Sequence, residues 1–424
     1  MNITQRYTLE GETSLLVHHH ILLYSSEILS HPVMSELLGN FCGQKIPDHE
    51  VKNLPHLFTE KKLVYLCGNV EALRQVLPHY DHRNYTLLVV KELCDNYAEY
   101  TEPFFEVIGL DKVPRNIHNA GVYIPNIFGS DLGHFERLCA EHEFQTLTEN
   151  NKPGSAYRKG IYLSEVSEID NNIQFHVMRC STNFRGPTDN FRSTDCEIVS
   201  SVNRVVQWFF KNPAPLNHVL AQIYYNTVKK AKISSHSDKT KDMPSNGVIA
   251  FCTFYDGQWM REVGTSKKHD PLEYCKQNTN VLTTLRFTLK NEDNKDELKD
   301  KPLEEKSTLK KQFDVVLQPN SIFIIPLSIN RLYKHEIKPP QLQATKIPTR
   351  LGYVIRCSNV LGVWSESGTY LKEDDRLVPL APITPTSRQR LYDLYREENK
   401  TTNKVDYGDI YFSMNEGDYE KPLL

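Results

Sequence analysis

The stretch from Lys232 to Asp242, "KISSHSDKTKD", places a histidine and an aspartate two residues apart, just before the apolar segment "GVIAFCTFY" (247–255). In a β-strand, residues i and i+2 point to the same side, about 7 Å apart at the backbone. His236 and Asp238 would therefore reach one ion if the strand continues through them. Because an isolated His-x-Asp pair also occurs in ordinary hydrophilic loops, the rest of the chain decides between the two interpretations.

Short apolar runs on both sides of this stretch predict an antiparallel β fold. The segment 196–210 has the periodicity of an amphipathic helix, and prolines follow it. The strand-like runs are "HVLAQIYYN" (218–226), "GVIAFCTFY" (247–255), "VLTTLRFTL" (281–289), "FDVVLQPNSIFIIPL" (313–327), "RLYKHEI" (331–337) and "RLGYVIRCSN" (350–359). Many short strands separated by polar segments are typical of a barrel or sandwich, with the helices packed outside.

The chain length of 424 residues predicts two or three domains. Residues 1–120 read as a small α/β domain, because "KKLVYLCG" and "NYTLLVVKEL" flank the helical pattern "VEALRQVL". Residues 121–370 form the main domain, with a charged insertion at 291–311 in which 13 of 21 residues are charged. Residues 371–424 form a polar C-terminal tail, in which "RQRLYDLYREE" predicts a helix and "NEGDYEKPLL" a frayed end.

The composition narrows the class of protein. A formal net charge of −3 argues against an overall polybasic nucleic-acid binder, although a local basic groove is compatible with it. Nine scattered cysteines without a CxxC pair indicate reduced thiols, as in the cytoplasm or nucleus. We find no signal peptide and no run of 18 apolar residues, so we expect an intracellular protein that does not insert into a membrane.

His335 follows the apolar run 313–327 and supplies a second imidazole. Two imidazoles and one carboxylate occupy one face of an octahedral metal and leave the other positions open, as in non-haem Fe(II) oxygenases. The same ligands also suit Zn²⁺. His236, Asp238 and His335 are therefore the candidate metal-binding and catalytic residues.

Arg350 and Arg356 lie six residues apart on one predicted strand, so both point to the same face. The planar guanidinium group suits a bidentate grip on a carboxylate better than a lysine does. A structural salt bridge is the alternative for Arg350, but two arginines on an otherwise apolar strand are costly without an anionic partner. Gln222 and Tyr224, two residues apart on an earlier strand, offer further hydrogen bonds.

The order Gln-x-Tyr, His-x-Asp, "LQPNSIF", His and Arg-x₅-Arg resembles the Fe(II)- and 2-oxoglutarate-dependent dioxygenases, most closely the AlkB-like group. The resemblance covers about 216–359. It implies an α+β protein whose double-stranded β-helix (jelly-roll) core has packed helices, here with the smaller N-terminal α/β domain in addition. It also implies that Fe(II), 2-oxoglutarate as cosubstrate and O2 take part in the reaction. Departures from the family pattern are Gln222 and Gly352, each in place of Asn, and Asn320 in place of Gly.

Carried over by motif, the resemblance makes His236, Asp238 and His335 the iron ligands. Arg350 would bind the distal carboxylate of 2-oxoglutarate, and Arg356 would lie near its proximal end and the metal. Gln222 and Tyr224 would assist these contacts.

The resemblance also implies the substrate class, a modified nucleobase in DNA or RNA. A nucleobase in a duplex would have to be flipped into the pocket. The alternatives are the same iron chemistry on a protein side chain or small metabolite, and a non-catalytic interaction protein with a degenerate barrel.

Overall fold

The computed structural model of the chain describes residues 8–13, 20–25, 37, 39–47, 62–71, 85–94, 96–129, 132–148, 155–180, 185–257, 282–290 and 310–424. Four β-sheets account for most of the regular structure, and the helices are few. Three of these sheets are wholly or mostly antiparallel. The protein is therefore a mixed α+β protein in which antiparallel sheets dominate. No helix within these residues is long and apolar enough to cross a membrane.

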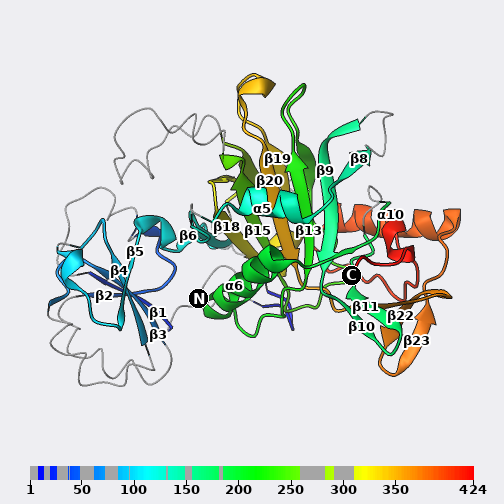
Figure 1. Cartoon of the computed structure of the whole chain (residues 1–424), viewed down its shortest axis with the longest axis horizontal. Coiled ribbons are helices and arrows are strands. Elements are labelled where there is room, and N and C mark those ends of the chain that lie inside the picture. Colours follow the sequence, from blue (N-terminus) through cyan, green and yellow to red (C-terminus); the bar gives the residue numbers. More distant parts are fainter. Residues whose placement is uncertain are drawn as a thin grey trace, which may run out of the picture.

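A parallel five-stranded sheet lies at one end of the molecule (Figure 1, left). Its order is β2-β1-β3-β4-β5, with β1 Ile21–Ser25, β2 Gln44–Pro47, β3 Lys62–Cys67, β4 Tyr85–Val90 and β5 Phe105–Ile108. The central strands are almost wholly buried, as expected for a parallel sheet that is covered on both faces. The helix expected over "VEALRQVL" falls almost entirely on residues 72–84, outside the described residues.

The central part of the molecule contains a large sheet and a smaller one that packs against it. The large sheet has the order β12-β9-β13-β20-β15-β18-β7-β6, with β8 paired to β9. Its strands are β6 Arg115–Ile117, β7 Gly121–Ile124, β8 Gln145–Thr148, β9 Ser155–Ser164, β12 Asp189–Asn190, β13 His218–Tyr224, β15 Val248–Tyr255, β18 Ser321–Pro326 and β20 Arg350–Arg356. The smaller sheet has the order β14-β19-β16-β17, with β14 Ile233–His236, β16 Thr284–Leu289, β17 Gln312–Val316 and β19 Tyr333–Lys338. All six strand-like runs of the sequence form strands here.

The large sheet has two apolar faces, as the alternation along β20 shows. Leu351, Tyr353 and Ile355 belong to the core cluster that contains helix α6 (Ser193–Phe209). Val354 packs on the opposite side, in the cluster that contains β16, β17 and β19 of the smaller sheet. Because side chains alternate along a strand, Arg350 and Arg356 share the inner face with Val354. The prediction that the two arginines point to one side is confirmed.

A third antiparallel sheet and the C-terminal residues form the opposite end of the molecule (Figure 1, right). The sheet has the order β10-β11-β21-β22-β23, with β10 Val166–Ile169, β11 Asn172–His176, β21 Leu361–Ser365, β22 Gly368–Glu373 and β23 Arg376–Pro379. Besides α6, the part of the chain that the structure describes contains the α-helices α5 His134–Glu141, α9 Leu327–Leu332 and α10 Pro385–Lys400.

Helix α10 confirms the helix predicted over "RQRLYDLYREE". Proline at its first position and Thr384 as N-cap explain where it begins, since the Thr384 hydroxyl accepts a hydrogen bond from the Ser387 amide. The expectation of a frayed end over 415–424 is wrong. Asn415 and Asp418 are buried and hydrogen-bonded to each other, and the Leu423 amide donates to Thr188. The polar side chains of this segment find partners inside the protein, which the sequence alone does not reveal.

His142 is buried between two carboxylates and links β12 to α6. Its two ring nitrogens lie 2.7 Å from Asp189 and 2.7 Å from Asp195, and Asp195 also accepts a hydrogen bond from Tyr353. Burial alone would lower the pKa of His142, but the hydrogen bonds to Asp189 and Asp195 outweigh it and raise this pKa to about 9. The imidazole is therefore protonated at neutral pH, and together with Arg192, which pairs with Asp189 at 2.8 Å, it offsets the charges of the two buried carboxylates.

This bridge predicts a pH dependence of stability. Because the folded pKa of His142 lies above its ordinary value of 6.5, the bridge contributes fully below about pH 6.5. The contribution, at most about 3 kcal/mol, is lost as the pH rises through about 9. Denaturant unfolding at pH 6.5 and pH 10 should show this loss in the wild type and much less of it in His142→Gln. Equal pH dependence in both proteins would contradict the assignment.

Candidate metal and cosubstrate site

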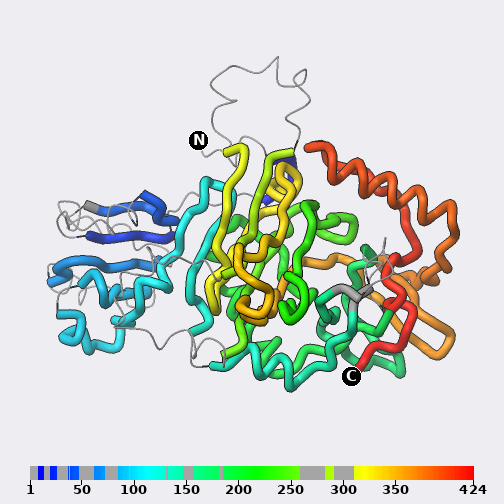
Figure 2. Tube along the Cα trace, turned by 90° about the horizontal axis from the view of Figure 1, so that it is seen from above, coloured from blue at the N-terminus to red at the C-terminus, as the bar shows by residue number. Residues whose placement is uncertain are grey.

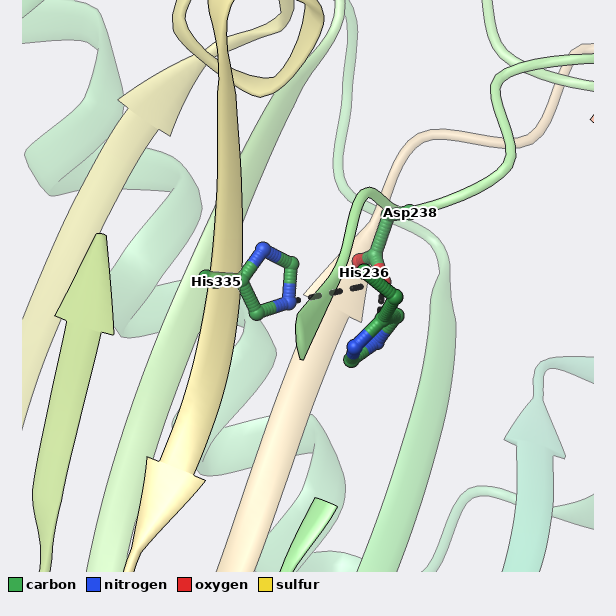
Figure 3. Close-up of side chains that lie close together, drawn as sticks. All are labelled: His236, Asp238 and His335. Carbon is green, nitrogen blue, oxygen red and sulfur yellow. Dashed lines mark ion pairs between the residues drawn. The ribbon is translucent and has the colours of Figure 1, made fainter. Parts of the chain in front are cut away.

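The three candidate metal ligands come together at the edge of the smaller sheet (Figure 3). His236 ends β14 and is directly opposite His335 on β19, with the ring centroids 4.5 Å apart. Asp238 follows two residues after His236, and its Oδ1 lies 3.7 Å from Nε2 of His236 and 3.8 Å from Nε2 of His335. One carboxylate oxygen thus faces both imidazoles.

These separations differ from those of a hydrogen-bonded histidine in the same chain. His142 lies 2.7 Å from each of its carboxylate partners, whereas the nitrogen–oxygen distances around Asp238 are about 1 Å longer. Metal–ligand bonds of about 2.0–2.2 Å place neighbouring ligand atoms about 3 Å apart. The group around His142 is therefore a hydrogen-bonded bridge. The group around Asp238 has room for an ion if its nitrogen and oxygen atoms move slightly closer together.

The His236 ring has the tautomer that a metal ligand needs. Its Nδ1 lies 2.8 Å from the carbonyl oxygen of Ser234, and a carbonyl can only accept, so Nδ1 carries the hydrogen. Nε2 then keeps its lone pair and points toward Asp238. A backbone carbonyl that fixes the ring in this way is a common partner of metal-bound histidines.

His335 is enclosed by aromatic rings. The ring centroids of Phe251 and Phe287 lie 5.2 and 5.6 Å from the centroid of the His335 ring, and the His335 side chain is only 4% exposed. Burial, together with the neighbouring His236, lowers the pKa of His335 to about 3, so this ring is neutral at physiological pH. The side chain of His236 is 34% exposed, which makes it the most open of the three. Any ion at this site would be approached from the side of His236.

Asp238 is oriented by Arg356, whose Nε donates a hydrogen bond of 2.9 Å to Oδ2. This contact leaves Oδ1 for the histidines. Burial alone would raise the pKa of Asp238, but Arg356 and the two histidines outweigh it and lower the value to about 2. The carboxylate is ionised over the whole physiological range. In this structure Arg356 therefore contacts a metal-ligand candidate directly.

Arg350 is a buried cation that lacks an anionic partner among the described residues. It is 2% exposed, its guanidinium carbon lies 4.1 Å from the centre of the Tyr224 ring, and its Nε and Nη2 have no hydrogen-bond partner there. Desolvating a guanidinium without such partners is costly, and stacking on a ring offsets only part of that cost. The site therefore provides unused hydrogen-bond donors for an anion.

Gly352 explains how Arg350 fits into the sheet. A Cβ at this position would lie 2.9 Å from Nη1 of Arg350 and 3.3 Å from the Tyr224 ring. The guanidinium therefore lies over Gly352, bent along β20 toward Arg356. On the neighbouring strands Gly352 is paired with Gln222 and Thr253, so these residues flank the guanidinium. The lack of a side chain at Gly352 therefore leaves room for the arginine.

The structure brings together Gln222 and Tyr224 as the sequence suggested, and the Tyr224 hydroxyl donates to the Gln222 amide oxygen at 3.1 Å. Sequence analysis missed Thr253, which lies across Gly352 from Gln222 and whose buried hydroxyl has no partner within the described residues. Thr253 lies in the apolar run "GVIAFCTFY", and threonine is common in β-strands, so the sequence shows no sign of a functional role. The i, i+2 alternation with Phe251 could have placed it on the inner face.

The turn between the two ligand positions is held from several directions. Asn330 of α9 accepts a hydrogen bond from the Asp238 amide and donates one to the Asp238 carbonyl, both at 2.9 Å. The Ser237 hydroxyl donates to the carbonyl of Tyr333 on β19. Sequence analysis missed Asn330 as well, because an asparagine in "LSINRL" carries no motif. These bonds fix the backbone of both ligand-bearing segments.

Comparisons with known proteins give little further information. No protein-family model matches the sequence, and no curated protein matches it. Among the solved structures that match is one titled "The structure of OsALKBH1", with 11% identity and a TM-score of 0.33. That match covers 56% of this chain and 96% of the other. A likeness of this extent carries no conclusion about function.

Proposed function

We propose that the protein is an Fe(II)- and 2-oxoglutarate-dependent dioxygenase of the AlkB-like type. The observation that carries the proposal is the buried guanidinium of Arg350, whose Nε and Nη2 have no partner among the described residues. It shares one face of β20 with Arg356, which contacts Asp238 of the His236, Asp238 and His335 group. A zinc site with the same three ligands would give that buried cation no role.

The residues of the site fit both groups that this chemistry requires. His236, Asp238 and His335 offer two neutral imidazoles and one carboxylate, the ligand set of the facial triad. Arg350 would hold the distal carboxylate of 2-oxoglutarate, with Thr253, Gln222 and Tyr224 beside it. When bound, Fe(II) and 2-oxoglutarate supply the oxidation of a C–H bond by O2, with succinate and CO2 as products.

Each side chain then has a role that follows from its contacts. The Ser234 carbonyl keeps Nε2 of His236 free to bind a cation, and Arg356 turns Oδ1 of Asp238 toward it. Phe251 and Phe287 keep water away from His335. Excluding water in this way strengthens electrostatic interactions inside the site.

The topology supports the finer fold assignment, a double-stranded β-helix. Strands β13, β20, β15 and β18 are neighbours in the large sheet, and β14, β19, β16 and β17 form the facing sheet. The chain crosses between the sheets after β13, β14, β15, β17, β18 and β19, so consecutive strands mostly belong to opposite sheets. That alternation is what a jelly roll requires.

We propose a modified nucleobase in DNA or RNA as the substrate. Support comes from the loop between β13 and β14, which carries Lys229 and Lys232, both exposed, directly before the strand of His236. Lysines in this place are suited to phosphate contacts. A protein side chain or small metabolite is the alternative substrate for the same chemistry.

An anaerobic titration tests the proposal. Fe(II) and 2-oxoglutarate should together give the weak visible charge-transfer band of such centres. After O2 is admitted, succinate release should increase with a methylated oligonucleotide. Absence of the band in the wild type would sink the oxygenase assignment. A band without stimulation by the oligonucleotide would assign the enzyme to a protein or metabolite substrate.

A further inference from the structure

Half of the polar run 237–242, which follows His236, is buried. Ser237, Asp238 and Asp242 are at most 6% exposed, although the sequence "SDKTKD" is typical of a solvated turn. Buried polar groups need hydrogen-bond partners inside the protein. For residues 237–240, many of those partners come from the last two turns of α10, about 160 positions later in the chain.

Asn399 of α10 contacts the residue between the two ligand positions. Its Oδ1 accepts a hydrogen bond of 2.8 Å from the backbone amide of Ser237, and its Nδ2 donates to the Tyr395 carbonyl one turn earlier. The second bond holds the amide of Asn399 in the orientation that presents Oδ1 to Ser237. The backbone between His236 and Asp238 is thus tied to the helix.

Glu398 contacts the next part of the same segment. Its Oε1 accepts from both the amide and the hydroxyl of Thr240, and its Oε2 accepts from the Tyr407 hydroxyl. Glu398 is 6% exposed, so these are buried, charge-assisted hydrogen bonds. The backbone of Glu398 is also bonded, because Lys290, which directly follows β16, donates a hydrogen bond of 2.7 Å to the Glu398 carbonyl.

Helix α10 is therefore connected to the segment that follows β14, through residues 237–240, and to Lys290, the residue that follows β16. It lies along the side of the molecule away from the parallel sheet (Figure 2). From these contacts we propose that Asn399 and Glu398 are positioning residues of the metal centre. They hold the backbone that sets the spacing of His236 and Asp238.

This inference rests on the proposed function, because it requires that the three-residue group binds a metal. Residues that orient metal ligands through hydrogen bonds alter metal affinity by about 10- to 100-fold when they are replaced. Asn399→Leu removes the acceptor for the Ser237 amide at similar size. Asn399→Asp keeps an acceptor oxygen for that amide but loses the Nδ2 donor to the Tyr395 carbonyl. Glu398→Ala removes the contacts to Thr240.

The test is a Co(II) titration of the full-length apo protein, followed by visible absorption and without 2-oxoglutarate. We expect Asn399→Leu and Glu398→Ala to bind Co(II) at least tenfold more weakly, with an altered spectrum. Asn399→Asp should bind Co(II) more tightly than Asn399→Leu, because it keeps an acceptor for the Ser237 amide. The matched control is Glu397→Ala, which removes the exposed neighbouring carboxylate from the same helix turn and should change nothing.

Thermal melting without metal separates positioning from stability. A variant that melts earlier but binds Co(II) as tightly as the wild type has lost a structural contact only. That result in both Asn399→Leu and Glu398→Ala would overturn the inference. If Asn399→Leu fails to fold, the Co(II) affinity of Glu398→Ala and the spectrum of Asn399→Asp test the inference instead. If the wild type itself binds no Co(II), the proposed metal site fails, and the inference fails with it.

Discussion

Asp238→Asn is expected to abolish the visible band that Fe(II) and 2-oxoglutarate give with the wild type. The substitution keeps the size of the side chain but removes the negative charge that both histidines and Arg356 face. It also leaves Arg356 buried without its carboxylate. Breaking a buried ion pair from one side costs about 3–5 kcal/mol. We therefore expect loss of the metal together with a lower stability.

His236→Ala separates these two effects. His236 is more exposed than its partners, and its Nδ1 hydrogen bond goes to the neighbouring backbone carbonyl of Ser234, so its removal should destabilise the fold little. The band should still disappear. Asp314→Asn is the control for the Asp238→Asn substitution, because Asp314 lies in the same sheet and pairs with Arg286 at the surface. A normal band in His236→Ala would contradict the ligand assignment.

Arg350→Met is expected to have opposite effects on stability and on cosubstrate binding. Without 2-oxoglutarate, methionine removes a buried charge whose Nε and Nη2 have no partner among the described residues, so the free energy of unfolding should rise by about 1–3 kcal/mol. With 2-oxoglutarate, the variant should lack the carboxylate contact. Truncating one partner of a buried charge pair costs about 2–5 kcal/mol of binding.

Denaturant unfolding with and without 2-oxoglutarate measures both effects. The cosubstrate should stabilise the wild type, because it binds the folded state, and should not stabilise Arg350→Met at the same concentration. Arg158→Met is the matched control, since Arg158 lies over the same Tyr224 ring at 6.0 Å but is partly exposed. If Arg350→Met lowers the stability of the cosubstrate-free protein, Arg350 is a structural residue.

Local periodicity made the strands and the faces of the site predictable. The even spacing of Arg350 and Arg356 placed both on one face because alternation is a property of the strand itself. His335 was predictable as a candidate ligand because it follows an apolar run, and the structure places it beside His236 and Asp238.

The supports of the site were not predictable in this way. "REENK" (396–400) reads as the solvated end of a helix, yet Glu398 is buried against Thr240. His142 lies in a run that also contains Glu141 and Glu143, and nothing in that run indicates a bridge to Asp189 and Asp195. Contacts between polar side chains far apart in the sequence depend on the packed fold, and neither spacing nor composition encodes them.

Strand β14 is the edge strand of its sheet, and this position has a consequence for how the site opens. Only Ile233 and His236 are in register with β19, and the ladder is irregular between them. A four-residue edge strand with so few backbone pairs unfolds locally at low cost, well below the energy of global unfolding. Release of an ion from this site would then follow the local opening of one strand, so its residence time is a property of that edge and not of the whole protein.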